Sequence, residues 1–227
     1  MESVSPHTLE KAPRGFTLVE MLVVLLIIAI ITTIALIGQS TFNRTLLLTD
    51  TAYTIALSIR EAQSLGLSSR RFDDIQNPGY GVRFSSATPD TFILFADTAA
   101  TLGVPINCPV GDDPDLPDAK PGNCLYDTGD GVVETFTFGR GYTITSFCGE
   151  DVSGVKRCSD TGYLETLNMA FLRSDTETVI NAERATGGWI ELTNAELYLS
   201  EPDAEQSRSI CVSKVGQVSV SQDPCPS

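Results

Sequence analysis

Hydrophobic residues are concentrated in one run near the N-terminus. Residues 16–38 contain a single charged residue, Glu20, and residues 21–31 are apolar without interruption. At about 1.5 Å per residue, a helix of this length spans roughly 34 Å, which is enough to cross the hydrocarbon core of a bilayer. A buried core helix and a secretory signal peptide are the alternatives, but the run is longer than a usual signal-peptide core and no A-x-A-like cleavage site follows it. We therefore expect a transmembrane helix over residues 16–38.

The pattern becomes amphipathic after this run. Apolar residues recur at i, i+3 and i+4 spacing and no proline interrupts them, which predicts a continuation of the helix over residues 39–69. A coiled coil is an alternative, but the repeat is short for one. The whole helix should extend from about residue 17 to about residue 67. The expected buried stripe consists of Leu47, Leu48, Ala52, Ile55, Ala56, Ile59, Ala62 and Leu65.

The remainder, residues 70–227, contains short runs of β-branched and aromatic residues separated by Gly or Pro, which are typical of strands. The stretch 105–131 is rich in Pro, Asp and Gly and predicts a loop. We therefore expect an α+β fold in which the long helix packs its apolar stripe on a C-terminal antiparallel β-sheet head. Candidate strands cover residues 80–84, 91–95, 132–138, 142–147, 167–172, 188–192, 195–199, 209–212 and 217–220.

Composition and charge narrow the possible functions. The 227 residues include 15 Lys+Arg and 29 Asp+Glu, and the net charge of −14 argues against nucleic-acid binding. The one histidine is His7, so a later histidine-based triad or His-rich metal site is excluded. No P-loop, dinucleotide fingerprint or nucleophile elbow is present, and we expect no enzymatic activity. Lys11 and Arg14 precede the apolar run, so the positive-inside rule places the N-terminus in the cytoplasm and the head across the membrane.

Glu20 is the one charge in the expected membrane span. A carboxylate near the bilayer centre costs on the order of 2.5–3.5 kcal/mol, so such residues usually face a partner. One alternative is that Glu20 only reaches the headgroup layer. The other is that Glu20 meets a positive charge supplied by another molecule.

Residues 14–20, with the sequence Arg-Gly-Phe-Thr-Leu-Val-Glu, resemble the leader-peptidase site of type IV pilins and type II secretion pseudopilins. The resemblance implies a leader peptide of residues 1–15, cleavage between Gly15 and Phe16 by a prepilin peptidase/methyltransferase, and N-methylation of the new Phe16 amine. Glu20 then becomes the fifth residue of the mature chain, which the family's assembly scheme pairs with the N-terminal amine of a neighbouring subunit. Many type IV pilins carry a proline where this chain has Ile37.

The resemblance implies a structural subunit of a type IV pilus or a type II secretion-like pseudopilus. Its partners would be the peptidase, other pilin subunits and an inner-membrane assembly platform, and the assembled subunit would lie in a cell-surface or periplasmic filament. Head-to-tail pairing of amine and carboxylate suits this function, because a contact that does not close generates a helical filament. One alternative is a minor pseudopilin that primes a secretion or DNA-uptake machine, since residues 56–63 weakly resemble minor pseudopilin H-like subunits. Another is a non-polymerising, signal-anchored surface protein that binds Ca²⁺ or another ligand.

All six cysteines lie beyond the membrane run, which suits an oxidising compartment. No pair has the C-x-x-C spacing of a zinc or redox site. We favour three local bridges, each around a turn-rich loop, and the last pair resembles the C-terminal disulfide loop of type IV pilins. The alternative is that some cysteines are free. The favoured pairs are Cys108–Cys124, Cys148–Cys158 and Cys211–Cys225.

Two acidic stretches, residues 111–118 and 127–134, offer the oxygen ligands that Ca²⁺ takes, although neither matches the EF-hand pattern. Residues 95–97 and 126–130 resemble the two ends of a loop in some pilin-like proteins, with an insertion between them here. No other cofactor is implied, and solvated acidic turns are the alternative to a Ca²⁺ site. The ligand candidates are Asp97, Asp127 and Asp130.

Overall fold

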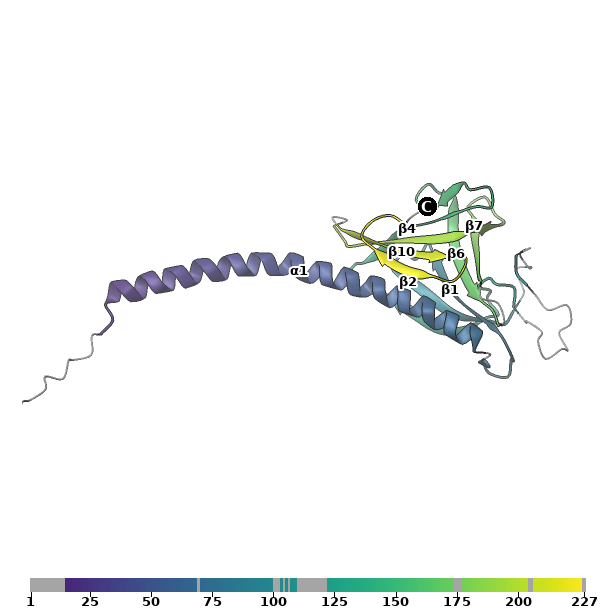
Figure 1. The fold of residues 1–227 in the computed structure, drawn as a ribbon, viewed down its shortest axis with the longest axis horizontal. Helices are drawn as coiled ribbons and strands as arrows, with labels where there is room; N and C mark the ends of the chain where they lie inside the picture. Colours follow the sequence, from purple (N-terminus) through teal and green to yellow (C-terminus); the bar gives the residue numbers. More distant parts are fainter. Residues whose placement is uncertain are drawn as a thin grey trace, which may run out of the picture. The chain divides into compact units, whose positions relative to one another are not determined.

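The computed structural model describes residues 15–68, 70–99, 103, 105, 107–109, 122–173, 177–203 and 206–225. Most of the expected leader and the acidic stretch 111–118 therefore lie outside the described residues. The chain divides into two compact units, Met1–Asn43 and Arg44–Ser227. One helix, α1 (Leu18–Leu67), accounts for the secondary structure that is described in the first unit (Figure 1).

Helix α1 begins at a threonine N-cap. Thr17 precedes the first turn, and its Oγ1 accepts a hydrogen bond from the Glu20 N–H at 3.2 Å. The Thr17 carbonyl accepts the Met21 N–H, also at 3.2 Å. Threonine is a favoured residue at this position, because its side-chain oxygen satisfies a backbone N–H that has no partner within the helix.

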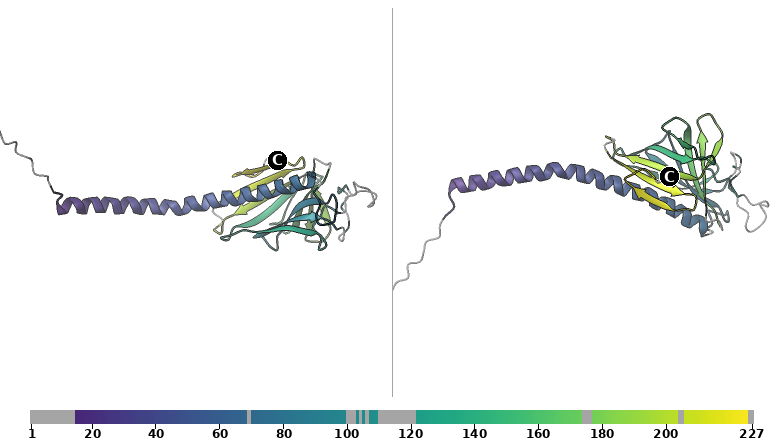
Figure 2. Two further views of the ribbon diagram at one scale, coloured as in Figure 1. Left: turned by 90° about the horizontal axis from the view of Figure 1, so that it is seen from below. Right: turned by 45° about the horizontal axis from the view of Figure 1, so that its top comes forward.

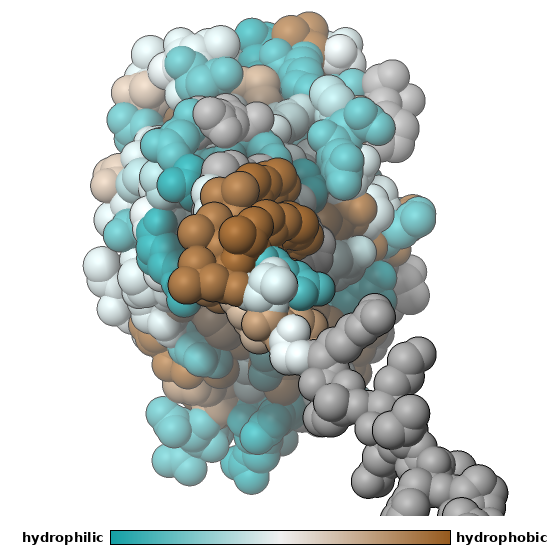
Figure 3. All heavy atoms as spheres, turned by 90° about the vertical axis from the view of Figure 1, so that its left-hand side faces the viewer, coloured by the Kyte–Doolittle hydropathy of each residue, from teal (hydrophilic) through white to brown (hydrophobic). Residues whose placement is uncertain are grey.

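The first part of α1, Leu18–Leu36, is long and apolar enough to cross a membrane. All of its side chains are exposed, and Figure 3 shows the apolar ones as a continuous hydrophobic block. Thr32 and Thr33 donate their hydroxyls to carbonyls three or four residues earlier at 2.7–3.0 Å. These hydroxyls are therefore satisfied within the helix, as a lipid environment requires.

The second unit contains two antiparallel sheets. The six-stranded sheet has the order β3-β2-β1-β6-β7-β8 and the five-stranded sheet the order β11-β10-β9-β4-β5. The first sheet comprises β1 (Gly79–Ser85), β2 (Thr91–Asp97), β3 (Gly131–Thr137), β6 (Leu164–Phe171), β7 (Thr178–Arg184) and β8 (Trp189–Leu192). The second comprises β4 (Thr143–Glu150), β5 (Lys156–Cys158), β9 (Asn194–Ser200), β10 (Ser207–Ser213) and β11 (Val218–Ser221).

The core joins the C-terminal half of α1 to both sheets, and Figure 2 shows this half of the helix running along the strands. Leu48, Ile55 and Ile59 are fully buried, as the sequence pattern predicted. They share one cluster with residues of both sheets, such as Phe84 and Leu197. The expected α+β architecture is thus confirmed, although the head contains two sheets and two strands, β5 and β7, that the sequence pattern missed.

Three disulfides link cysteines within the head. Cys108–Cys124 lies in the long loop, the segment between β2 and β3, Cys148–Cys158 joins directly opposite residues of β4 and β5, and Cys211–Cys225 links Cys225 to β10. These are the three pairs that sequence analysis favoured. No cysteine is free.

The helix stripe provides a direct test of this core. Leu48 is fully buried, so we expect Leu48→Ala to lower the free energy of unfolding by about 2–5 kcal/mol, through lost burial and a residual cavity. Leu57 lies on the same helix but is 65% exposed, and Leu57→Ala should change stability by less than about 0.5 kcal/mol. Urea unfolding followed by the fluorescence of Trp189, the single tryptophan, measures both. Equal losses in the two variants would contradict this packing.

Candidate functional site

The residues of the expected leader-peptidase site lie at the start of α1. Gly15, Phe16 and Thr17 precede the helix and are exposed, with Phe16 at 76% exposure. A Cβ added at Gly15 would meet no heavy atom within 4 Å, so packing does not require glycine there. The peptide bond between Gly15 and Phe16 is therefore accessible to a protease within the described part of the chain.

Glu20 lies in the first turn of α1 and is exposed. This position favours a carboxylate, because the helix macrodipole places partial positive charge at the N-terminus. The N-cap Thr17 binds the backbone N–H of Glu20 and not its carboxylate. Among the residues that the structure describes, no Lys or Arg forms an ion pair with its side chain.

The three predicted Ca²⁺ ligands belong to one hydrogen-bonded network between the end of β2 and the start of β3. Asp97, at the end of β2, is fully buried, and its two oxygens accept the N–H groups of Asn123 at 3.0 Å and Cys124 at 2.6 Å. The loop passes so close that a Cβ at Gly122 would lie 1.9 Å from the Asp97 Cγ. Glycine at this position is therefore a steric requirement of the contact.

Asp130 holds the other side of the network. Its Oδ1 accepts the N–H groups of Thr98 and Ala99 at 2.8 Å, and its Oδ2 accepts the Asp127 N–H at 2.6 Å. Asp127 is buried, and its Oδ2 accepts a hydrogen bond from Asn123 Nδ2 at 3.1 Å. Asp130 thereby links the end of β2 to the turn before β3.

Asn123 is the residue of this network that sequence analysis missed. It is fully buried, donates to Gly103 O and Asp127 Oδ2, and accepts the Leu125 N–H on its Oδ1. An amide that both donates and accepts can join carbonyl, carboxylate and N–H groups at one point. The available signal was an Asn beside a cysteine, four residues before the candidate ligand Asp127.

Burial and charge both act on the carboxyls of this network. Burial raises the pKa of Asp97 to about 8, the N–H groups of Cys124 and Asn123 lower it, and the charges of Asp130 and Asp127 raise it further. Burial also raises the pKa of Asp130, against three backbone N–H donors. A proton in this network is therefore favoured at mildly acidic pH.

The network holds backbone N–H groups on the oxygens of Asp97 and Asp130 and does not form a preformed metal cage. Ca²⁺ takes about 6–8 oxygen ligands at about 2.3–2.6 Å, whereas the oxygens of Asp97 and Asp130 here accept backbone N–H groups. Within the described residues, three acidic or cysteine side chains bring ligand atoms within 4.8 Å of one another only at Cys148, Cys158 and Asp160, where the sulfurs form a disulfide. Ca²⁺ binding at Asp97, Asp127 and Asp130 stays a prediction.

The raised pKa of Asp97 predicts a pH-dependent stability. Because the folded-state pKa of about 8 lies above the ordinary value of 3.8, the protonated carboxyl stabilises the fold below about pH 4, and this contribution is lost as the pH rises through about 8. We expect the unfolding free energy of the wild type, relative to Asp97→Asn, to fall over this interval. Urea unfolding in EDTA at a series of pH values measures this difference in unfolding free energy. A wild type that gains stability relative to Asp97→Asn as the pH rises would contradict the assignment.

Comparison with known proteins identifies the N-terminal segment. Residues 11–36 match a family described as "Prokaryotic N-terminal methylation motif". No curated protein and no solved structure matches the chain. The match covers the expected cleavage site, Glu20 and the apolar part of α1 as far as Leu36. The chain therefore carries at its N-terminus the methylation motif that is the signature of type IV pilins and pseudopilins.

Proposed function

We propose that this chain is a prepilin that is cleaved between Gly15 and Phe16, methylated on Phe16 and assembled into a type IV pilus or a type II secretion-like pseudopilus. The observation that carries the proposal is the methylation motif followed by Leu18–Leu36, a helical segment that is apolar and exposed on every side. An exposed surface of this kind needs lipid or other apolar helices around it. Membrane insertion before cleavage and helix packing after assembly supply these two environments.

The local structure at Glu20 supports an intermolecular ion pair. Cleavage would create a positive amine on Phe16, which lies before the first turn of α1. In lipid, an unpaired amine and an unpaired carboxylate are both costly, and pairing lowers both costs. A carboxylate from a neighbouring subunit would also face the partial positive charge of the helix N-terminus. The Glu20 carboxylate of each subunit would form an ion pair with the Phe16 amine of the next subunit.

The proposed cleavage site and the apolar segment together imply a membrane topology. Residues 1–15 form the leader on the cytoplasmic side, and residues 16–38 span the membrane. Residues 39–69 continue the helix, and residues 70–227 form the extracytoplasmic head. The three disulfides of the head agree with an oxidising compartment. Its processing partner would be a prepilin peptidase, and its assembly partners other pilin subunits and an inner-membrane platform.

The charge of the chain favours a minor subunit as a second candidate. In the leader, Glu2 and Glu10 offset Lys11 and Arg14, so the mature chain keeps the net charge of −14. Like charges of this size repel when identical heads are brought into contact. A subunit present in few copies among less acidic subunits avoids that repulsion. The ratio of this chain to the major subunit in purified filaments distinguishes the two candidates.

The mature N-terminus is the first test of processing. We expect protein purified from its native membrane to begin at N-methylated Phe16, because the motif directs cleavage after Gly15. Intact mass measurement and N-terminal peptide sequencing read this directly. A chain that still begins at Met1 in a cell with an active leader peptidase would contradict the proposal and favour the non-polymerising anchor.

Substitution of Glu20 tests assembly separately from processing. The hydrogen bond at the start of α1 uses the backbone N–H of residue 20, so Glu20→Gln keeps this bond and removes the charge. We expect the variant to be cleaved but to enter filaments at least about tenfold less, because the neighbouring amine stays unpaired in an apolar environment. Immunoblotting of sheared or cross-linked filaments measures incorporation.

Glu61 offers the matched control, since it is an exposed glutamate on the same helix. Glu61→Gln should be cleaved and incorporated like the wild type. Normal incorporation of Glu20→Gln would contradict the proposed ion pair but would not contradict cleavage after Gly15. The two parts of the proposal therefore fail separately.

A further inference from the structure

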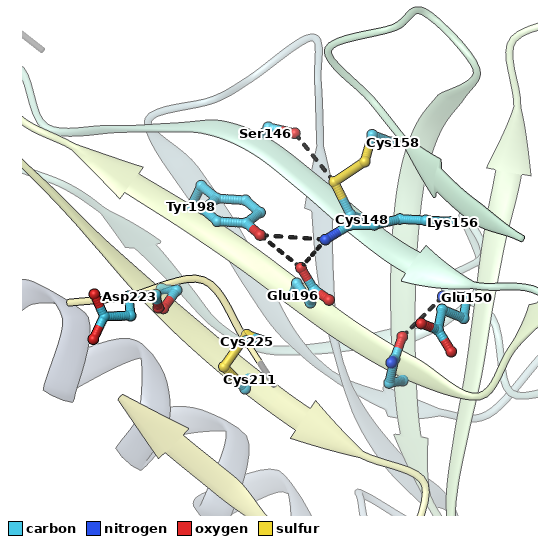
Figure 4. Close-up of polar contacts among 12 residues, drawn as sticks. Ser146, Cys148, Glu150, Lys156, Cys158, Glu196, Tyr198, Cys211, Asp223 and Cys225 are labelled. Atoms are coloured by element: carbon cyan, nitrogen blue, oxygen red, sulfur yellow. Dashed lines mark hydrogen bonds and ion pairs between the residues drawn. A yellow bond between two sulfur atoms is a disulfide. The ribbon is translucent and has the colours of Figure 1, made fainter. Parts of the chain in front are cut away.

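Each sheet of the head has two edge strands, and three of these four edges are short and already contacted. β8 has four residues and is joined to Asp151 by an isolated bridge. β11 also has four, and its Val218 carbonyl accepts a hydrogen bond from Arg60 of α1 at 3.1 Å. β5 has three, and Figure 4 shows its Lys156 side chain bonded to Glu196, at 2.6 Å. Short strands and lysines at an edge discourage the addition of a further strand.

The fourth edge, strand β3, is longer and open. β3 comes first in the order of the six-stranded sheet and pairs with β2 alone among the described strands. Its side chains are mostly exposed, with Val132 at 46%. The sequence Val-Val-Glu-Thr-Phe-Thr is rich in β-branched and aromatic residues, and it has neither the lysine nor the proline that often protects an edge. β3 therefore keeps the properties of a strand that another strand can join.

The backbone of β3 presents free hydrogen-bonding groups at alternate residues. A register shift leaves Val133 without a partner in β2, and the pairing is regular after it. Just beyond the strand, the Phe138 N–H donates to the Asp90 carbonyl at 2.8 Å. Because the backbone groups of an antiparallel strand point alternately toward and away from its neighbour, those of Thr135 and Thr137 point away from β2. Both residues therefore offer an N–H and a C=O to an added strand.

The side chains along this edge define what an added strand must carry. Glu134 and Phe136 lie on the core-facing side of the sheet, and Phe136 stacks on Phe92 with ring centroids 4.6 Å apart. Phe136 and Phe138 are only partly buried, so the flank of each ring can still pack against a neighbour. Glu134 is exposed and forms no ion pair within the part of the chain that the structure describes. Residues that alternate with the outward-bonding ones face an added strand at the close, non-hydrogen-bonded positions.

We propose that β3 is a docking edge for an extended segment of another protein, which adds to the six-stranded sheet as an antiparallel strand. The segment would read apolar-x-apolar-x-basic, with its apolar residues beside Phe138 and Phe136 and its Lys or Arg opposite Glu134. The net charge of −14 favours a basic partner over a second copy of this chain, because identical heads repel one another. In this mode of recognition, main-chain hydrogen bonds supply the affinity and alternate side chains supply the specificity. The inference concerns the head and does not depend on cleavage after Gly15.

Fluorescence polarisation of a labelled peptide tests strand addition to the full chain in a zwitterionic detergent. The probe is fluorescein-Ser-Val-Thr-Val-Thr-Lys-Ser-amide, whose two threonines would bond to Thr137 and Thr135. N-methylation of both threonines removes the N–H donors that face β3 and should abolish binding. N-methylation of both valines, whose N–H groups face away from β3, is the matched control and should retain binding. Equal binding of the two methylated peptides would overturn the proposal.

Variants of the chain locate the binding to β3. Because the Thr135 N–H points to the free edge, Thr135→Pro removes no bond to β2, and it should abolish binding with an unchanged thermal unfolding curve. Glu134→Lys should weaken binding of the lysine peptide at least about tenfold and favour the same peptide with Glu in place of Lys. Glu165→Lys makes the same charge change at an exposed position of β6, an interior strand, and should bind like the wild type. Undiminished binding in a folded Thr135→Pro variant, or a wild-type dimer in light scattering that this variant loses, would contradict the proposal.

Discussion

The apolar stripe of α1 is the contact on which the head depends, because it shares one hydrophobic core with both sheets. Leu48, Ile55 and Ile59 of this stripe are fully buried, and they share one hydrophobic cluster with residues of both sheets. The same helix is exposed on every side from Leu18 to Leu36. One continuous element thus has an apolar surface all round at its N-terminal end and a one-sided stripe at its C-terminal end. This change of pattern suits one end of the helix to an apolar environment such as a membrane and the other end to the core of a folded head.

Outside the core, the head is held by covalent and polar links at its loops. Disulfides fasten the long loop, the β4–β5 pair and the end of the chain. At the long loop, Asp97 adds two backbone hydrogen bonds beside Cys124, one of which is donated by Cys124 itself. The Cys108–Cys124 disulfide reduces the conformational entropy of the unfolded chain. The buried Asp97 carboxylate then satisfies the N–H groups of Asn123 and Cys124 in the folded state. The combination explains how Asn123 and Cys124 are held at the end of β2.

Sequence patterns predicted this fold where the information is local. The helix ends at Leu67 as expected, since a continuous 3.6-residue period can be read over many turns. Strand β7 was missed because Thr178–Arg184 is buried over most of its length and shows no alternation, and β5 because three residues carry no periodic signal. The cluster around Glu196 and Lys156 was missed for another reason. These two residues are 40 positions apart and meet only through strand pairing, which no spacing in the sequence reveals.

Glu20 combines two demands that would otherwise conflict. A carboxylate inside an apolar run opposes membrane insertion, yet at the third position of the helix it is favoured by the macrodipole. Removal of a leader ending at Gly15 would add a positive amine before the same helix end, where the backbone already presents partial positive charge. In the proposed filament, a neighbour's carboxylate would face both this amine and the helix dipole. The position of Glu20 in the first turn of α1 therefore matters as well as its charge, because the carboxylate it would offer to a neighbour also lies where its own helix end is partly positive.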